Sequence, residues 1–209
     1  ADQDVFALTI DLMPQMDALD KRFRLPIIDI AIPALKQLSD SQYPSFKENL
    51  VALVNMDDRV DLFEWSLQKI LFSHLGGHFG KAPLAARRRA DPGQLTRELG
   101  LVLSVIAYAG AADQGSAQSA FDAAAQSLAD KGLALLAKDQ IRLADLDQAL
   151  GTLDRLAPAD KSRLLTACVI STWHDQRATP TEVELLRAFA SVLDCPMPPG
   201  MAPGARHDN

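Results

Sequence analysis

Two short stretches decide the fold: residues 57–64 read DDRVDLFE, and residues 175–182 read DQRATPTE. We call them the acidic turns. Each places a side chain that accepts hydrogen bonds three residues before a glutamate; these four residues are Asp61, Glu64, Thr179 and Glu182. This spacing is typical of a capping box, in which both side chains satisfy free backbone N–H groups at the start of a helix. The sequence therefore predicts that a helix begins directly after each acceptor.

The acidic turns belong to a longer repeat with an offset of 118 residues. The two copies align without a gap, and each reads as helix, turn, helix, acidic turn, helix. Shared amphipathic spacing explains part of the agreement, but matched polar positions such as Asp29 and Asp147 favour a duplication. We predict one helical domain over 1–195, with repeat units 27–75 and 145–193, a helical insertion 76–144, and a flexible tail over 196–209.

The remaining sequence also has the period of helices, and it lacks alternating β-branched runs. We therefore expect an all-α fold of about eight helices in one bundle. The Gly76-Gly77 pair predicts a helix end followed by a loop over 76–90. The predicted helices span 3–12, 26–38, 41–55, 62–75, 92–110, 116–131, 145–156, 158–172 and 180–193.

Composition narrows the class of protein. The chain has 209 residues, of which 48% are hydrophobic and 23% are charged, and its formal net charge is -6. These values exclude disorder of the whole chain. The negative charge argues against a nucleic-acid partner, because phosphates need a clustered positive face. The two cysteines, Cys168 and Cys195, make no disulfide framework and indicate a reducing compartment.

The longest stretch without a charged residue, 99–112, is shorter than the roughly 20 residues that a membrane helix needs. We therefore predict that it forms a buried core helix. The chain shows no signal peptide and does not begin with Met, so we expect a piece of a longer protein or a processed product.

The carboxylates of the acidic turns admit a second interpretation, a site for a hard cation. The candidate ligands are Asp57, Asp61 and Glu64 in the first turn, and Asp175 and Glu182 in the second. The first turn does not fit an EF-hand loop, because Val60 stands at the glycine position and Ser66 at that of the closing glutamate. We prefer the cap interpretation and keep metal binding as the alternative.

Two further features are candidate contacts. The basic run Arg87-Arg88-Arg89 is the one cluster of positive charge, and we interpret it as a solvated loop or as a contact for anionic lipid headgroups. Trp173 lies beside the second acidic turn, where an aromatic side chain near the surface would anchor a protein partner.

The sequence contains no catalytic constellation that we recognise. His74 and His78 have the spacing of zinc ligands on one helix face, but we expect Gly76-Gly77 to end that helix and an imidazole to cap it. Cys168 falls inside a predicted helix, where a small core side chain is expected. We therefore predict no catalytic residue and no cofactor-binding residue.

The acidic turns resemble the signature of TerB-like (tellurite-resistance) helical domains. The pattern here is Asp-x-Arg-(Val or Ala)-x-x-x-Glu, and the usual family form is Asp-Gly-x-(Ile/Val)-x-x-x-Glu. This chain has Asp58 and Gln176 at the glycine position. The resemblance implies two TerB-like helical units and, as one function, a stand-alone metal-responsive binding module in stress or tellurite resistance.

Nearly the whole chain also resembles the C-terminal region of bacterial membrane-bound zinc metallopeptidases, relatives of HtpX and of the CAAX prenyl proteases. The stretches that carry this resemblance are LPIIDIAIPAL (25–35), RVDLFEW (59–65), ELLRAFA (184–190) and LDCPMPP (193–199). In that family the membrane helices and the catalytic HExxH helix precede this region, and the present chain contains no HExxH.

This second resemblance implies a non-catalytic, soluble interaction or regulatory domain of a membrane-bound zinc metalloendopeptidase. Zinc would belong to the parent protein, and this chain would carry no cofactor. The implied partners are the protease domain of the same parent chain, a protein substrate or adaptor, and an anionic membrane surface. The implied location is the cytoplasmic side of the bacterial inner membrane.

Overall fold

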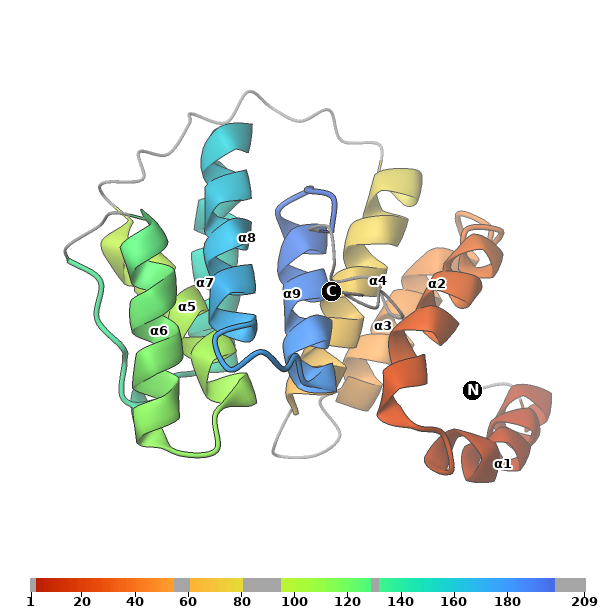
Figure 1. Cartoon of the computed structure of the whole chain (residues 1–209). Coiled ribbons are helices and arrows are strands. Elements are labelled where there is room, and N and C mark those ends of the chain that lie inside the picture. The colour runs from red at the N-terminus through yellow and green to blue at the C-terminus, as the bar shows by residue number, and fades with distance from the viewer. Residues whose placement is uncertain (1–2, 55–60, 81–94, 129–131, 198–209) are drawn as a thin grey trace.

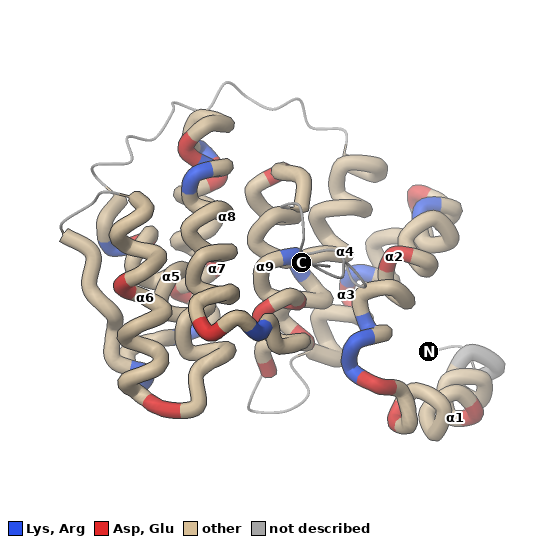
Figure 2. Tube along the Cα trace, in the orientation of Figure 1, with Lys and Arg blue, Asp and Glu red and all other residues tan. Residues whose placement is uncertain are grey.

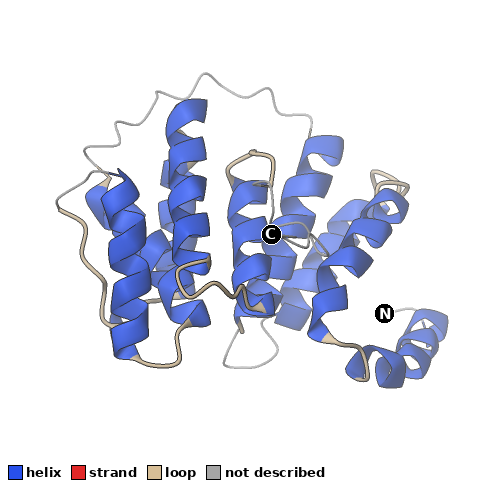
Figure 3. Cartoon of the chain, viewed as in Figure 1, coloured by secondary structure: helices blue, strands red, loops and turns tan. Residues whose placement is uncertain are grey.

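The structure is a computed structural model, and it describes residues 3–54, 61–80, 95–128 and 132–197. These residues are helical and include no strand (Figure 3), as the sequence predicts. They form nine α-helices and two short 3₁₀ helices, which roughly matches the predicted bundle of about eight helices and its nine predicted ranges. In chain order these are α1 (Gln3–Asp17), η1 (Lys21–Phe23), α2 (Arg24–Leu35), α3 (Gln42–Val54), α4 (Leu62–Phe79), α5 (Thr96–Gly110), α6 (Gln114–Leu128), η3 (Lys138–Gln140), α7 (Leu143–Leu153), α8 (Pro158–Thr172) and α9 (Pro180–Val192).

Helix α4 continues four residues beyond its predicted end, so the prediction that Gly76-Gly77 breaks it is wrong. The helix reaches Phe79, whose ring stacks on Tyr43 of α3 with 4.3 Å between the ring centroids. The backbone N–H of Gly80 closes the last turn by donating to the Gly76 carbonyl oxygen at 2.6 Å. These contacts offset the roughly 1 kcal/mol that each glycine costs inside a helix. The rest of the predicted loop, 81–90, lies outside the described residues.

Helices α4 and α9 lie side by side at the centre of the molecule and run in the same direction (Figure 1). On one side, α2 and α3 pack against α4. On the other side, α5 and α8 pack against α9, and α6 packs against both α5 and α8. Helix α7 lies against α5. Helix α1 lies beyond α2 and leans away from the bundle (Figure 1).

The offset of 118 residues recurs in the helix boundaries. We call α2–α4 the first unit and α7–α9 the second unit. Adding 118 to the end of α2, the end of α3 and the start of α4 gives the end of α7, the end of α8 and the start of α9. The matched boundaries are Leu35 and Leu153, Val54 and Thr172, and Leu62 and Pro180. The relation of these units to TerB-like domains stays a prediction.

Two ion pairs relate the units reciprocally. Asp29 of α2 accepts from Arg187 of α9, with 2.9 Å between Oδ1 and Nη2. Asp147 of α7 accepts from Lys69 of α4, with 2.8 Å between Oδ1 and Nζ. Both aspartates, and both cations, are equivalent under the 118-residue offset. Residue i of one unit thus meets residue j of the other, and j meets i, which is the pattern of a two-fold interface. The pseudo-two-fold axis that relates the two units therefore lies between α4 and α9 and is parallel to both helices.

The core lies around this axis. Trp65 of α4 is 3% exposed and sits edge-on to Phe189 of α9, with 6.1 Å between the ring centroids. Its indole N–H donates to Asp147 Oδ1 at 2.8 Å, so Asp147 ties α7 to α4 twice. Helix α5, predicted to be a buried core helix, buries nine consecutive residues, Leu99–Ala107. The packing of α4 against α9 therefore holds the two units together, and α5 packs on the helices of the second unit.

Candidate functional site

The first acidic turn contains the predicted capping box. Asp61 Oδ1 accepts from the backbone N–H groups of Phe63 at 2.6 Å and of Glu64 at 2.9 Å. In return, Glu64 Oε2 accepts from the backbone N–H of Asp61 at 3.2 Å. These side chains thus satisfy three backbone donors at the start of α4. Asp57, the third candidate ligand of this turn, lies outside the described residues.

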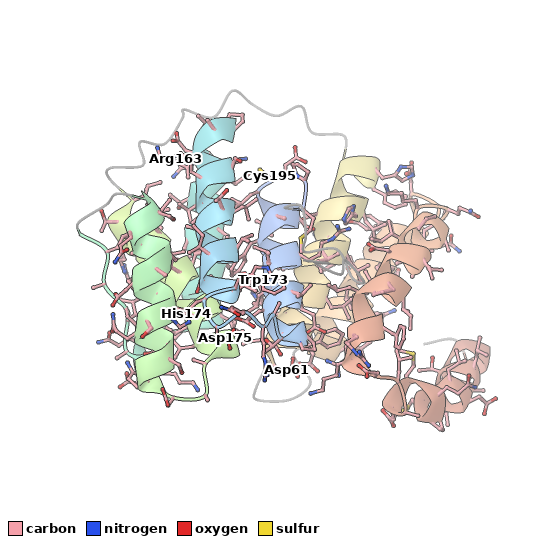
Figure 4. All side chains as sticks on the ribbon, in the orientation of Figure 1. Asp61, Arg163, Trp173, His174, Asp175 and Cys195 are labelled. Atoms are coloured by element: carbon pink, nitrogen blue, oxygen red, sulfur yellow. The ribbon has the colours of Figure 1, made fainter. Side chains whose placement is uncertain are left out.

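The second acidic turn repeats the box at the start of α9. Glu182 Oε2 accepts from the backbone N–H and the hydroxyl of Thr179, at 2.8 Å and 2.7 Å, and the Glu182 N–H donates to Thr179 Oγ1 at 3.3 Å. Asp175 is exposed, and its Oδ1 accepts from the backbone N–H of Arg177 at 3.0 Å. Figure 4 shows Asp61 and Asp175 at the same end of the bundle.

Gln176 takes the left-handed conformation, with a φ of 64°. A side chain with a Cβ atom pays about 1–2 kcal/mol for this conformation, whereas glycine adopts it freely. The position is the one at which the TerB-like signature has glycine. The second acidic turn therefore has a backbone for which glycine is the best residue.

In the described parts of the two turns, each candidate carboxylate accepts backbone hydrogen bonds through one of its oxygen atoms. Asp61, Glu64 and Glu182 use their carboxylates to close the helix starts, and Asp175 turns one oxygen to the backbone. Within the described ranges, no three side chains of His, Cys, Asp or Glu gather where they could hold a metal ion. A site that includes Asp57 stays a prediction.

Two glutamates of α9 are buried. Glu182 packs on Gly110, the last residue of α5, so closely that a Cβ atom at this glycine would overlap the carboxylate. Burial raises the pKa of Glu182, and the hydrogen bonds from Thr179 lower it by a smaller amount. Burial also raises the pKa of Glu184, which lies 3.9 Å from the Arg24 guanidinium, measured between Oε1 and Nη1.

Glu184 and its first-unit counterpart, Ser66, share an unusual environment. Each is buried, and neither Glu184 Oε1 nor the Ser66 hydroxyl has a hydrogen-bond partner within the described residues. The Arg24 guanidinium lies over the Phe63 ring, 4.1 Å from its centroid, and balances part of the Glu184 charge. A buried acceptor without a full partner costs free energy, so Glu184 and Ser66 each lower the free energy of unfolding.

The other predicted residues fall in different places. Arg87-Arg88-Arg89 lies outside the described residues. Trp173 is half-buried and packs against the hydrophobic core at the end of α8. Cys168 is fully buried, and burial raises the pKa of its thiol to about 12, so it acts as an apolar side chain at neutral pH.

His74 lies inside α4 and does not cap it, because the helix continues past it, whereas His78 lies in the last turn of the helix. Its Nε2 lies 3.5 Å from Arg187 Nη2 on α9. His78 is exposed and meets the edge of Phe79, with 4.7 Å between the ring centroids. The two imidazoles therefore point to different neighbours.

Sequence reasoning missed the surface of α1. The described residues include nine large exposed hydrophobic side chains, and six of them lie on this helix, each 45–60% exposed. We call these six the α1 face: Phe6, Leu8, Ile10, Leu12, Met13 and Met16. At 100° per residue they cover more than half of the helix circumference. The signal was present in the sequence, because a helix with so wide an apolar face needs a cover.

Helix α1 differs in the sign of its charge from the segment that follows it in the chain. Asp11 and Asp17 are the described charges on α1, and residues 1–20 contain no Lys or Arg. The first basic residues come directly after it, at Lys21, Arg22 and Arg24 (Figure 2). The helix thus combines a wide apolar face with negative charge alone.

Comparison with protein-family models, with curated proteins and with solved structures finds no match to this chain. Of the helices in the described ranges, none combines the length and the apolar character that crossing a membrane would require.

Proposed function

We propose that this chain is a non-catalytic interaction or regulatory domain of a membrane-bound zinc metalloendopeptidase, on the cytoplasmic side of the inner membrane. The observation that carries an interaction role is the α1 face. The parent class comes from the resemblance of the four stretches within residues 25–199. Zinc would be bound by the HExxH motif of the parent, and no residue of this chain would take part in hydrolysis.

The α1 face supports a protein partner on energetic grounds. Complete burial of an apolar side chain of this size contributes about 1.5–3 kcal/mol, so covering the exposed half of each contributes roughly 1 kcal/mol. Six such side chains on one helix are enough to drive docking of the helix into a groove. A surface of this kind on a soluble helix is typical of an interaction site.

Charge favours a protein groove over an anionic membrane as the partner of α1. Helices that lie on anionic lipids carry Lys and Arg on their polar side. Helix α1 carries aspartates there, Asp11 among them, and no basic residue. The complementary surface is therefore an apolar groove with a neutral or basic rim, on the protease domain or on a protein substrate. The lipid contact proposed for Arg87-Arg88-Arg89 is a separate question.

The left-handed Gln176 supports the TerB-like assignment of the units. The signature of that family has glycine at this position, and the backbone here has the φ that glycine favours. Gln176 lies three residues before the helix cap Thr179, in the turn that joins α8 to α9.

The first test is to read the coding sequence upstream of Ala1. We expect an HExxH helix and several apolar segments of about 20 residues. A start codon at or just before Ala1 would overturn the assignment to a membrane protease.

The second test changes the α1 face in the full-length protein. The double variant Leu8→Glu/Leu12→Glu places two charges on the face, and Ala7→Glu places one on the opposite side of the same helix. We expect the double variant to alter the rate at which a membrane-protein substrate is cleaved in cells, and Ala7→Glu to leave it unchanged. Equal rates for wild type and both variants, at equal protein levels, would contradict the proposal.

A further inference from the structure

A small, partly open cavity lies between the C-terminal halves of α4 and α9, and the segment after α9 lines one part of it. Its volume is about 200 Å³, which corresponds to roughly six water molecules. It lies at the end of the bundle where Cys195 is labelled in Figure 4, opposite the acidic turns. The residues that matter for its chemistry are Ser73, His74, Arg187, Ser191, Pro196 and Met197.

The hydrogen-bond donors of the cavity come from both units. Ser73 of α4 and Ser191 of α9 are equivalent under the 118-residue offset, so the cavity straddles the pseudo-two-fold axis. Arg187 reaches Asp29 and His74 through Nη2 alone in the contacts described above. A planar guanidinium has five N–H donors, so Arg187 retains the capacity to donate to a further acceptor through Nε and Nη1.

The positive charge nearest to His74 in the cavity is that of Arg187. Arg187 donates toward His74 Nε2, which requires a neutral imidazole with its proton on Nδ1. Burial lowers the pKa of His74, and the charges of Arg187 and Lys36 lower it further, while Asp29 raises it. An anion bound between His74 and Arg187 would stabilise the protonated imidazole. Two other titratable groups, Asp194 and Cys195, also line the cavity.

Carbonyl oxygens at the end of α9 would compete with an anion for hydrogen-bond donors, and two of them already have a donor. Cys195 N–H donates to Ala190 O at 2.9 Å, and Lys161 Nζ donates to Leu193 O at 2.9 Å. Asp194 has a φ of 51°, so the helix ends in a left-handed residue of the Schellman type. The charge of Lys161 also offsets the negative end of the helix dipole.

We propose that this cavity binds a carboxylate carried on a short apolar chain. The carboxylate accepts from Arg187, Ser73 and Ser191, and the apolar part packs on Pro196 and Met197. A guanidinium matches a carboxylate in shape and donates two parallel hydrogen bonds to it. A single negative charge fits better than a phosphate dianion, because Asp29 already shares the charge of Arg187. The inference concerns this chain alone and does not depend on the proposed function.

Two sources offer this chemistry, the C-terminus of a protein and a free small carboxylic acid, so the experiment uses both. The acetylated tripeptide Gly-Ala-Val is titrated with a free carboxyl terminus and, separately, with a terminal amide, and isobutyrate is the third probe. NMR follows the His74 imidazole and the amides of Ala190 and Ser191. We expect saturable shifts with the free-acid peptide, at least tenfold weaker binding of the amide, and a rise in the pKa of His74 on binding.

Matched variants separate binding from folding. Arg187→Gln and Asp29→Asn both remove the same ion pair, but only the first removes the cation from the cavity. We expect Arg187→Gln to weaken binding at least tenfold, about 1.4 kcal/mol, and Asp29→Asn to retain or strengthen it. Lys69→Gln, at the equivalent position away from the cavity, leaves binding unchanged.

The outcomes are separable. Isobutyrate binding as tightly as the peptide supports the proposal and assigns a free acid, and peptide binding at least tenfold tighter supports it and assigns a chain terminus. Equal binding of peptide acid and amide, or no shift with either acid up to about 10 mM, overturns it.

Discussion

The two units share an order of helices and matched boundaries, yet they differ in how deeply the same residues are buried. Leu153 and Leu185 of the second unit are fully buried, whereas their first-unit counterparts, Leu35 and Leu67, are only half-buried. The cause lies in the insertion. Helices α5 and α6 cover α7 and α8, while α3 packs mainly against α4. Burial in each unit is therefore decided by its neighbours.

The sequences of α3 and α8 have adapted to this difference. Leu165 and Ala167 of α8 are buried, and the equivalent residues of α3 are Lys47 and Asn49, both exposed. Polar residues on the open helix keep its outer face solvated. Two copies of one helix pattern thus carry different residues, because one copy has gained a cover. The order and the matched ends of the helices are therefore the same in both units, whereas the residues on the outer faces of α3 and α8 differ with their surroundings.

The largest effect should come from truncating the same leucine in the two units. We expect Leu153→Ala to cost about 2–5 kcal/mol of unfolding free energy, because it opens a cavity in a closed core. Leu35→Ala should cost less than half as much, since solvent already reaches that side chain. Urea unfolding measures both. Leu75→Ala and Leu193→Ala, which remove two fully buried and equivalent side chains, are the control pair and should agree. Equal costs for Leu35 and Leu153 would refute the difference in cover.

The reciprocal ion pairs should also be unequal. Asp147→Ala leaves the buried indole N–H of Trp65 without its acceptor, and we expect a cost of about 1–3 kcal/mol. Asp29→Ala removes a more exposed pair with Arg187 and should cost at most about 1 kcal/mol. Chemical unfolding followed by tryptophan fluorescence measures both. Lys69→Met, which keeps the indole hydrogen bond, should resemble Asp29→Ala; a larger cost for Asp29→Ala than for Asp147→Ala would contradict this interpretation.

The equivalent positions Glu184 and Ser66 should differ in their pH dependence. A carboxyl group whose pKa is raised by folding adds stability below its unfolded pKa, about 4.3, and loses it as pH rises through the folded value. We therefore expect Glu184→Gln to unfold at a higher urea concentration than wild type at pH 7, with the difference vanishing near pH 4. For Ser66→Ala, the difference from wild type in the urea concentration of unfolding should be the same at both pH values. A Glu184→Gln difference that does not change with pH would sink the explanation.

Backbone strain in the second acidic turn predicts a gain in stability. Gln176→Gly should stabilise the fold by about 1 kcal/mol, because glycine adopts the left-handed conformation without strain. Gln148→Gly, in the interior of α7, should destabilise it by a similar amount. Thermal unfolding compares the two variants. A loss of stability in Gln176→Gly would count against strain at this turn.

The smallest effect concerns metal. Because Asp61, Glu64 and Glu182 are used as helix caps, we expect millimolar calcium to leave the melting temperature unchanged. A calcium-dependent rise that disappears in Asp57→Asn would instead favour the metal-responsive alternative and would distinguish the first turn from the second.

The features of the fold that could be predicted from the sequence are those set by residues close together in the chain. The capping boxes involve residues three apart, and the repeat places the helices of each unit within a few residues of their observed ends. Prediction from the sequence fails for features that depend on residues far apart in the chain. The extension of α4 depends on Tyr43, and the partner of the Trp65 indole lies 82 residues away, on Asp147.

The two reciprocal ion pairs between the units could nevertheless have been predicted from the sequence. The identity of Asp29 and Asp147, together with the matched cations Lys69 and Arg187, predicts reciprocal pairs once two units are assumed to pack face to face. The cavity at Arg187 could not be located in this way, because it depends on where whole helices lie.

The parallel pairing of α4 and α9 has a consequence for synthesis. About 100 residues separate the end of α4 from the start of α9. At translation rates of about 5–20 residues per second, the apolar side of α4 waits roughly 5–20 s for its partner to leave the ribosome. During that interval the nascent first unit exposes side chains such as Ile70 and Leu71, which are buried in the finished protein. Because α4 is synthesised well before α9, chaperones have this interval in which to bind the incomplete chain.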